Sequence, residues 1–217
     1  MRQAELFPGP EPDHRELVAP GMTLFRHYFD EAEQQALAAE IETVVHRSPW
    51  FTPLMPRSGR PFSVKMTNCG CLGWISDRDG YRYTPSHPVS GAPWPAIPPL
   101  VLQAWQALAD YPHLPEACLV NLYDSNAKMG LHQDRDEAEF AAPILSISLG
   151  CSCAFRHGGL RRADPTQKLE LHSGDVLVMG GPARLIFHGV DRIFQGTSDL
   201  LPEGGRINLT LRRVNLP

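Results

Sequence analysis

The second half of the chain consists mainly of short alternating segments, and this pattern constrains the fold more than any other feature. From Ala117 onward, segments rich in aliphatic residues are separated by Gly, Pro and Asp, with no helical pattern between them. Many short strands joined by turn residues favour a β-sandwich or a jelly roll. The predicted strands cover residues 117–123, 144–150, 169–172, 175–179, 184–188 and 206–213.

The first half of the chain carries two helical patterns. Asp30 and Glu33 form a capping-box pair, and aliphatic residues then recur at helical spacing, which predicts a helix over 31–47. A second helix is expected over about 98–110. Residues 1–16 are polar and rich in proline and predict a flexible arm.

Proline is frequent in the segment from about 49 to 99. Because proline cannot donate a hydrogen bond to a strand partner, it is confined to sheet edges and turns. Residues 62–67 and 81–84 have strand patterns, so we expect a short sheet with long loops laid over the main domain, as in a substrate-binding lid. The predicted fold class is α+β and mainly β: a single domain over 1–217, with a sandwich or jelly-roll core over about 115–213, N-terminal helices packed on it, and the lid.

The last predicted strand alternates strictly between polar and aliphatic residues. Arg206, Asn208, Thr210 and Arg212 share one face, and the aliphatic residues between them share the other. One interpretation is a surface strand with a solvated face. The other places the polar face inside a barrel, where two guanidinium groups require anions to neutralise them. Further candidates for the wall of such a cavity are Leu119, Asn121, Tyr123, Ser146 and Ser148.

His132 and Asp134 are two residues apart, and His188 follows much later in the chain. Two histidines and one carboxylate are the donor set of a facial triad that holds Fe(II) and leaves one side open. With nine histidines in the chain, solvated loop residues are the alternative interpretation. A dicarboxylate that chelates iron at one end and pairs with an arginine at the other, such as 2-oxoglutarate, would explain both the triad and the arginines.

Composition excludes several classes of protein. A formal charge of −4 argues against a protein that coats nucleic acid electrostatically, although Arg161 and Arg162 belong to a basic loop that is either a solvated surface or a local contact. No apolar run approaches the roughly 20 residues of a membrane span, and the N-terminus lacks the features of a secretory signal. The five cysteines do not have zinc-site spacing. We therefore expect a cytoplasmic protein that does not contact membranes. Separately, we expect a monomer, although composition does not fix the oligomeric state.

An ordered series of motifs along the chain resembles the AlkB family of Fe(II)- and 2-oxoglutarate-dependent nucleic-acid dealkylases. The similarity runs from about Val18 to Arg213. The combination of motifs is more specific than any single one. They are Met66–Gly70, Leu72–Trp74, Gly80–Tyr81, Ala117–Asn121 with Tyr123, Leu131–Asp134, Asp136, Ser146–Gly150, Gly158–Leu160, Gly174–Asp175, Phe187–Gly189 and Arg206–Thr210 with Arg212.

The resemblance implies a single catalytic domain over 1–217, with a double-stranded β-helix (jelly-roll) core and a nucleotide-recognition lid over about 49–99. It also implies an oxidative demethylase that uses Fe(II), 2-oxoglutarate and dioxygen. It would hydroxylate the N-methyl group of 1-methyladenine or 3-methylcytosine and release formaldehyde, succinate and carbon dioxide. The implied iron ligands are His132, Asp134 and His188. Arg206 would pair with the distal carboxylate of 2-oxoglutarate, with help from Tyr123. The remaining implied pocket residues are Asn121 and Arg212 near the other carboxylate, with Leu119, Ser146 and Asn208.

On the substrate side, the resemblance implies alkylated DNA, single- or double-stranded, with RNA as a further candidate. Such an enzyme must flip the base out of a duplex or act on a single strand. Trp74 would stack on the base, Tyr81 would contact a phosphate, and Asp136 would contact the base itself. Ordinary lid packing is the alternative for the two aromatic residues. The other implied nucleotide contacts are Met66, Lys128, Met129 and Arg162.

Two positions depart from the pattern of the family. Pro56 stands in place of a hydroxyl residue that contacts DNA, and the 77–79 segment Asp-Arg-Asp replaces a more basic one. Both affect the expected grip on the phosphate backbone. Two alternatives therefore stay open: an oxygenase of the same chemistry that acts on RNA, a protein or a small molecule, and a non-catalytic jelly-roll binding module.

Overall fold

The computed structural model describes residues 14–217. Its helices are α1 (Glu31–Arg47) and α2 (Pro99–Leu108), with a 3₁₀ turn at Gly181–Ala183. The strands are β1 (Arg15–Ala19), β2 (Met22–Phe25), β3 (Lys65–Gly70), β4 (Gly73–Asp77), β5 (Gly80–Thr84), β6 (Ala117–Tyr123), β7 (Met129–His132), β8 (Ile144–Gly150), β9 (Cys153–His157), β10 (Gln167–Leu171), β11 (Val176–Met179), β12 (His188–Ile193) and β13 (Arg206–Arg212).

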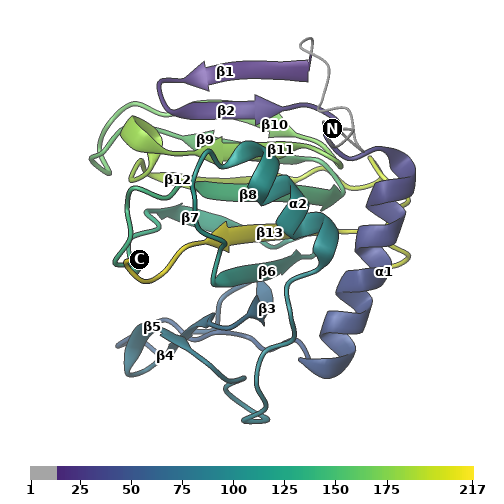
Figure 1. The fold of residues 1–217 in the computed structure, drawn as a ribbon, viewed down its shortest axis with the longest axis vertical. Coiled ribbons are helices and arrows are strands. Elements are labelled where there is room, and N and C mark those ends of the chain that lie inside the picture. Colours follow the sequence, from purple (N-terminus) through teal and green to yellow (C-terminus); the bar gives the residue numbers. More distant parts are fainter. Residues whose placement is uncertain (1–13) are drawn as a thin grey trace, which may run out of the picture.

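Two antiparallel sheets form the body of the molecule. The larger has seven strands in the order β1-β2-β11-β8-β13-β6-β3, and the smaller has four in the order β10-β9-β12-β7. Strands that are distant in sequence lie side by side, as expected for a double-stranded β-helix, and Figure 1 shows the two sheets layered together. The jelly-roll fold predicted from the sequence is confirmed.

Strand β13 separates two environments, as its alternation predicts. Its polar residues line a cavity between the two sheets. Ile207, Leu209 and Leu211 point to the opposite face and belong to a hydrophobic cluster that includes residues of both helices. The polar face is therefore internal, and the solvated-strand interpretation is wrong.

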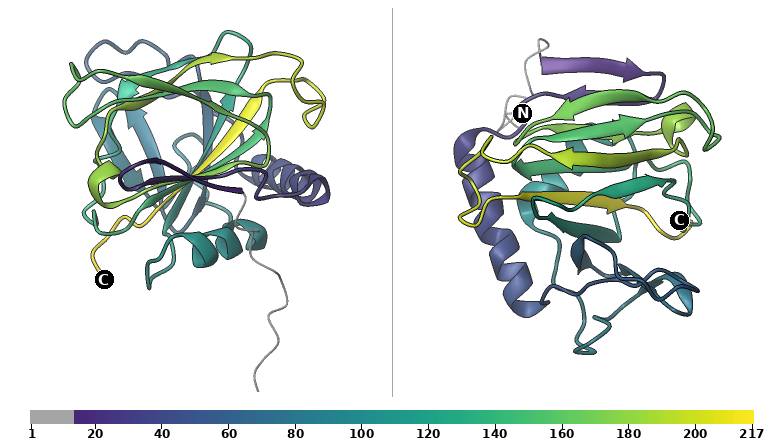
Figure 2. Two further views of the ribbon diagram at one scale, coloured as in Figure 1. Left: turned by 90° about the horizontal axis from the view of Figure 1, so that it is seen from above. Right: turned by 180° about the vertical axis from the view of Figure 1, so that it is seen from behind.

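Both helices cover the outside of the larger sheet (Figure 2). Helix α1 begins at a complete capping box, in which the Asp30 side chain accepts from the Glu33 backbone and the Glu33 side chain accepts from the Asp30 backbone. Helix α2 buries Trp105, whose indole N–H donates to the His113 carbonyl at 3.0 Å. Among residues 14–217, no helix has the length and hydrophobicity that crossing a membrane requires.

The segment from 49 to 99 differs in part from its prediction. Strand β3 pairs with β6 and so extends the larger sheet. Only β4 and β5 form the separate short sheet, a two-stranded hairpin (Figure 1). The hairpin lies next to the edge of the larger sheet that β3 forms, since β4 contacts both β3 and β6. We refer to residues 73–84 as the hairpin from here on.

Two other sequence predictions require correction. A strand over 184–188 was expected, but a 3₁₀ turn that contains Pro182 occupies 181–183, and the strand begins only at His188 and continues to Ile193. The arm predicted for 1–16 lies outside the described residues as far as residue 13. Its last two residues, Arg15 and Glu16, form the start of β1.

A glycine permits close contact between β12 and β7. A Cβ atom at Gly189 would lie 2.5 Å from the Met129 carbonyl oxygen and 3.0 Å from Gly130. Any larger residue would push the two strands apart. Just before this contact, His188 of β12 is the direct cross-strand partner of His132 of β7.

Candidate active site

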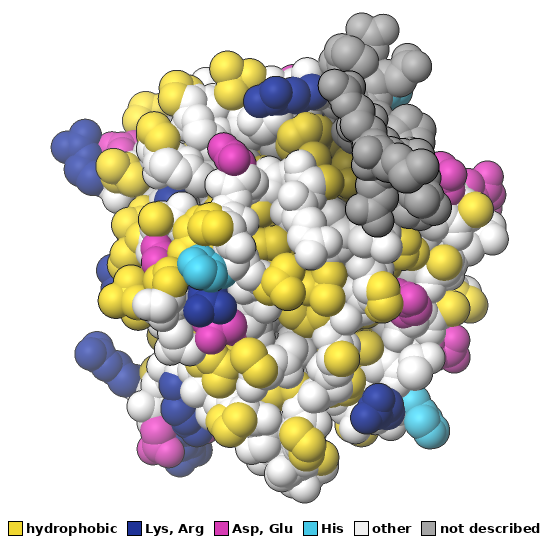
Figure 3. All heavy atoms as spheres, in the orientation of Figure 1, with side chains coloured by type: hydrophobic (Ala, Val, Ile, Leu, Met, Phe, Trp, Pro, Cys, Tyr) yellow, Lys and Arg dark blue, Asp and Glu magenta, His cyan; other side chains and the backbone are white. Residues whose placement is uncertain are grey.

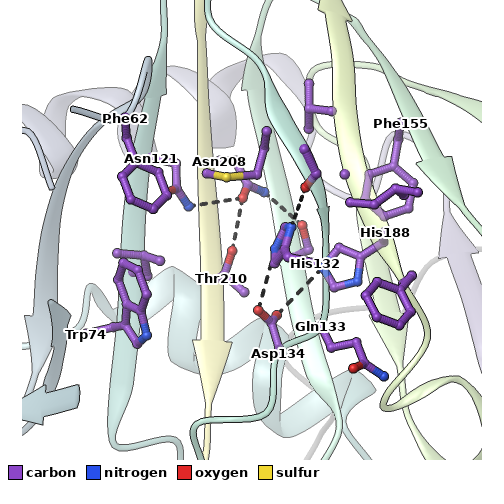
Figure 4. A pocket seen from close by; sticks show the side chains of 18 of the residues that line it. Phe62, Trp74, Asn121, His132, Gln133, Asp134, Phe155, His188, Asn208 and Thr210 are labelled. Atoms are coloured by element: carbon purple, nitrogen blue, oxygen red, sulfur yellow. Dashed lines mark hydrogen bonds and ion pairs between the residues drawn. The ribbon is translucent and has the colours of Figure 1, made fainter. Parts of the chain in front are cut away.

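A cavity of about 610 Å³ lies between the two sheets and opens toward the hairpin. Its size is within the range of ~300–1,000 Å³ typical of small-molecule sites. Its walls come from β6, β8 and β13 on one side and from β7, β9 and β12 on the other. Figure 4 shows polar side chains from both sheets pointing into it.

Three potential metal ligands meet in this cavity. Ligand atoms of His132, Asp134 and His188 all lie within 4.8 Å of one another. The Nε2 atom of His132 is 3.7 Å from Asp134 Oδ1, and Nε2 of His188 is 3.8 Å from Asp134 Oδ2 (Figure 4). Among the described residues, this is the one group of His, Cys, Asp and Glu side chains whose ligand atoms lie close enough together to hold a metal ion. Two imidazoles and one carboxylate match the facial donor set for Fe(II).

Both imidazoles are oriented by backbone carbonyl groups. Nδ1 of His132 lies 2.9 Å from the Gly130 carbonyl oxygen, and Nδ1 of His188 lies 3.1 Å from that of Ile186. Donation from Nδ1–H leaves each Nε2 with a free lone pair directed at Asp134, the arrangement that metal-binding histidines require. Burial, with the neighbouring His132, lowers the pKa of His188 to about 4, so its imidazole is neutral near pH 7.

The carboxylate of Asp134 is held in its ionised form. Burial alone would raise the pKa of Asp134, but the positive charge of Arg212 and its hydrogen bond to the carboxylate outweigh burial, and the pKa falls far below its usual range. Arg212 Nη2 is 2.9 Å from Asp134 Oδ1, and both side chains are buried. The structure therefore places Arg212 beside the carboxylate of the metal-binding cluster.

The other end of the cavity is built to receive an anion. The Arg206 side chain is 1% exposed. Its Nη2 donates to Ser148 Oγ at 2.8 Å, whereas its Nε and Nη1 atoms are buried without a hydrogen-bond partner in the described structure. A buried guanidinium with unused donors is costly unless a ligand supplies acceptors. Buried Tyr123 also lines this end. These residues fit a carboxylate.

Between the two ends, polar side chains form one hydrogen-bonded row. Asn208 Nδ2 donates to Ser146 Oγ at 2.8 Å, and Thr210 Oγ1 donates to Asn208 Oδ1 at 2.9 Å. Asn121 reaches the same oxygen at 3.4 Å, while its own buried Oδ1 has no partner (Figure 4). Leu119 lines the cavity beside this row. The row gives the wall between Arg206 and the metal-binding cluster a fixed pattern of donors and acceptors.

Aromatic residues of the hairpin form the mouth of the cavity. Trp74 and Tyr81 are stacked, with ring centroids 5.5 Å apart and an interplanar angle of 20°. The Trp74 indole N–H donates to Asp136 Oδ2 at 2.8 Å. Phe62 packs edge-on against Trp74 (Figure 4). The mouth thus combines a flat aromatic surface with a carboxylate, two groups suited to a heteroaromatic ring.

The structure brings nearly all the predicted site residues together. Those of the triad, the co-substrate pocket and the substrate side line one cavity, with the exception of Lys128. The Lys128 side chain is exposed. The Ser63 hydroxyl, in the loop before β3, donates to the Lys128 carbonyl at 2.9 Å and accepts from the Lys128 backbone N–H at 3.1 Å. Arg162 reaches the cavity from the basic loop and donates to the Leu131 carbonyl at 2.7 Å.

Four polar residues near the site were not predicted. Gln133 donates to the Leu185 carbonyl at 2.6 Å and so ties the turn that carries Asp134 to the segment before His188. Glu137 and Arg184 form a buried ion pair of 3.0 Å, and the Tyr83 hydroxyl donates to Glu137. The only signal in the sequence is the placement of Glu137 three residues after Asp134, and this spacing is too common to be specific.

Comparisons with known proteins agree with this geometry. The model of the 2OG-Fe(II) oxygenase superfamily matches residues 21–212. The fold and the His-Asp-His cluster are those of this class of enzyme, which uses Fe(II), 2-oxoglutarate and dioxygen.

Several relatives narrow the class. An alpha-ketoglutarate-dependent dioxygenase AlkB homolog of Caulobacter vibrioides is 52% identical over 91% of this chain and 89% of its own length. The alpha-ketoglutarate-dependent dioxygenase AlkB of Escherichia coli is 43% identical over 97% of both chains. The solved structure of OsALKBH1 superposes with a TM-score of 0.77 at 33% identity, and the match covers 92% of this chain and 99% of that one. The chain belongs to the AlkB family.

Proposed function

We propose that this protein is an oxidative demethylase that removes N-methyl groups from alkylated bases in DNA, 1-methyladenine and 3-methylcytosine above all. One observation carries the proposal. A single cavity joins the His-Asp-His cluster and the unpaired donors of Arg206 to a mouth formed by an aromatic stack and a carboxylate. Relatives with demethylase names support it, among them the Arabidopsis thaliana DNA N(6)-methyladenine demethylase ALKBH1C at 33% identity.

In this proposal His132, Asp134 and His188 hold Fe(II), and Arg206 with Tyr123 holds the distal carboxylate of 2-oxoglutarate. Bound Fe(II), with 2-oxoglutarate and dioxygen, supplies an oxidant that hydroxylates a C–H bond. Asn121, Ser146 and Asn208 orient the co-substrate, and Leu119 packs beside it. Arg212 contacts Asp134 and lines the cavity, so it would neutralise charge on Asp134 and on the nearer carboxylate of the co-substrate.

The hairpin and its neighbours select the substrate. Trp74 stacks on the flipped or single-stranded base, a contact worth about 1–3 kcal/mol in other nucleic-acid complexes. Asp136 faces the base and favours a cationic ring such as 1-methyladenine or 3-methylcytosine over its uncharged parent. Tyr81, Met66, Lys128, Met129 and Arg162 complete the contacts to the nucleotide. The segment from about 49 to 99 thus serves as the nucleotide-recognition lid of a single catalytic domain.

Local charge on the lid favours a nucleic-acid partner despite the net charge of −4. Arg57, Arg60 and Arg78 are exposed, and the Arg78 guanidinium lies next to Gly59. Asp77, which departs from the basic family pattern, is paired with Arg82 through contacts of 2.6 and 2.8 Å. Figure 3 shows Lys and Arg side chains projecting at the lower left, where Figure 1 places the hairpin. Such cations can contact phosphates.

The five cysteines are free thiols, and four of them are buried. Free thiols persist in a reducing compartment. The proposed enzyme is a monomer that works in the cytoplasm, and its free thiols suit that reducing compartment.

The direct test is formaldehyde release from methylated single-stranded DNA and from RNA of the same sequence, with and without 2-oxoglutarate. We expect release from the DNA only when 2-oxoglutarate is present, and the RNA arm measures whether RNA is a second substrate. Unmethylated DNA is the matched control. Decarboxylation of 2-oxoglutarate without formaldehyde from either nucleic acid would overturn the proposal and favour an oxygenase that acts on a protein or a small molecule.

A further inference from the structure

The hairpin is attached to the catalytic core through a matched pair of hydrogen bonds. Trp74 of β4 and Tyr83 of β5 are direct cross-strand partners, so their side chains leave the hairpin on the same face. Trp74 donates to Asp136, and Tyr83 donates to Glu137, the next residue along the chain. Asp136 and Glu137 follow closely after Asp134 of the metal-binding cluster.

Glu137 is buried and lies at the centre of a group of charges. Its carboxylate accepts from Tyr83, lies 3.0 Å from Arg184 Nη2 through Oε2, and lies 3.4 Å from Arg212 Nε through Oε1. The side chains of Glu137, Arg184 and Arg212 are 1%, 3% and 6% exposed. Two arginines therefore balance the two carboxylates of Glu137 and Asp134 in a nearly water-free space.

Both arginines also hold Asp134. Arg212 Nη2 contacts the Asp134 carboxylate at 2.9 Å, and Arg184 Nη1 donates to the Asp134 backbone carbonyl at 2.6 Å. Arg184 is fixed further by a bond of 3.0 Å from its Nε to the Ala142 carbonyl. The side chain and the main chain of Asp134 are thus positioned by two groups that share Glu137 as their anchor.

We propose that Glu137 is a positioning residue that couples the hairpin to the metal-binding carboxylate, through the path Tyr83–Glu137–Arg212–Asp134. This inference rests on the proposed function. A base that contacts Asp136 shares that carboxylate with the indole N–H of Trp74, which occupies Oδ2 alone. The Tyr83–Glu137 bond is the contact between the hairpin and this loop that the base does not share, so it transmits the position of the hairpin on a bound nucleotide to Asp134.

The coupling has a reciprocal consequence. If a bound nucleotide improves the orientation of Asp134, it tightens the binding of Fe(II) and 2-oxoglutarate, and these ligands must tighten nucleotide binding by the same factor. Couplings between sites in proteins are commonly on the order of 5- to 150-fold. Loss of the Tyr83 hydroxyl should remove most of this factor and leave the hairpin folded, because phenylalanine keeps the ring.

The first experiment measures the half-saturating concentration of 2-oxoglutarate in the anaerobic Fe(II) complex, by its charge-transfer absorption. It is measured with and without a saturating oligonucleotide that contains 1-methyladenine. In the unaltered protein we expect the oligonucleotide to tighten binding at least about fivefold. In Tyr83→Phe the two values should agree within about twofold.

Tyr28→Phe is the matched control, because Tyr28 is a half-buried tyrosine that packs beside Phe25 and Phe29, away from the cavity. This control variant should keep the full factor. A Tyr83→Phe protein that keeps the full factor would overturn the inference.

A second experiment needs neither nucleic acid nor turnover. Glu137→Gln keeps the shape of the side chain and removes its charge, and Mn(II) affinity is measured by titration after thermal melting has shown that the variant is folded. Partners that orient metal ligands typically contribute about 10- to 100-fold to metal affinity, and we expect a loss in this range. An unchanged Mn(II) affinity would overturn the positioning role. Because this result does not depend on the substrate, it separates failure of this inference from failure of the proposed demethylase activity.

Discussion

His132 and His188 are direct cross-strand neighbours on β7 and β12, with their ring centroids 4.5 Å apart. The antiparallel register of the two strands therefore sets the separation of the two imidazoles. Gly189 permits this register, because any Cβ atom there would meet the backbone of β7. Each Nδ1 faces a carbonyl group two residues away along its own chain segment. The metal-binding geometry is thus built mainly from the backbone.

Removal of either imidazole should abolish turnover. In His132→Ala and His188→Ala, one of three protein ligands is lost, and we expect formaldehyde release to fall to background and Fe(II) binding to weaken strongly. The jelly roll should remain folded, since neither side chain belongs to a hydrophobic cluster. The measurements are formaldehyde release, Fe(II) content and circular dichroism. The control is His113→Ala, an exposed histidine outside the cavity. Wild-type activity in either variant would show that the triad is wrongly assigned.

Arg206→Ala should act on the co-substrate. Loss of one member of a buried charge pair costs on the order of 2–5 kcal/mol, so the half-saturating concentration of 2-oxoglutarate should rise steeply, with a smaller change in affinity for DNA. Titration of 2-oxoglutarate at fixed DNA concentration measures the effect. Exposed Arg47 at the end of α1 provides the control substitution Arg47→Ala. The role of Arg206 is disproved by a titration curve that coincides with that of the unaltered protein.

Asp136→Asn should alter lesion preference. Asparagine can still accept from the Trp74 indole, but it lacks the charge that favours a cationic base. We expect repair of 1-methyladenine or 3-methylcytosine to slow by about tenfold more than repair of neutral 1-methylguanine or 3-methylthymine. The measurement is the ratio of kcat/KM values for one lesion of each kind in the same oligonucleotide. If the ratio does not change, Asp136 serves to hold Trp74, and selectivity resides elsewhere.

Asp30→Ala should lower stability without affecting the site. The Asp30 carboxylate accepts from the Glu33 backbone N–H at 2.8 Å, and loss of such a cap typically costs about 1 kcal/mol. Urea unfolding measures the change in the free energy of unfolding. Asp30→Ser restores a capping oxygen and should recover most of the loss. Equal destabilisation by alanine and serine would mean that the cap contributes little.

The sequence predicted those parts of the fold in which local patterns are strong. Helix α1 and strands β6 and β8 were predicted with the bounds that they have in the structure. Strands β2 and β7, with four residues each, are too short to show a periodic pattern. Alternation also failed at 184–188, where a turn that contains Pro182 delays the strand. Pairing order, which brings β2 next to β11, depends on contacts far apart in sequence.

The site, like the fold, has parts that the sequence predicts and parts that it does not. The triad and the polar face of β13 were predicted from spacing and from family resemblance, because those residues occur in recognisable motifs. The buried ion pair of Glu137 and Arg184 was not predicted, because the two residues lie far apart in the chain and only the fold brings them into contact. Tyr83 belongs to a predicted strand, and nothing in a strand pattern shows which distant residue its hydroxyl will contact.

All three candidate metal ligands lie on or beside strands of the jelly roll, whereas the aromatic mouth belongs to the hairpin. This separation gives the two parts different freedom to vary. Under the proposed function, changes in the hairpin would alter which nucleobase is accepted and leave the three metal ligands in place. The same separation makes the hairpin a natural place to engineer new specificity, provided that a donor at position 83 is retained to meet Glu137. A transplanted hairpin that lacks this hydroxyl would still recognise its target, but its position would no longer be transmitted through Glu137 to Asp134.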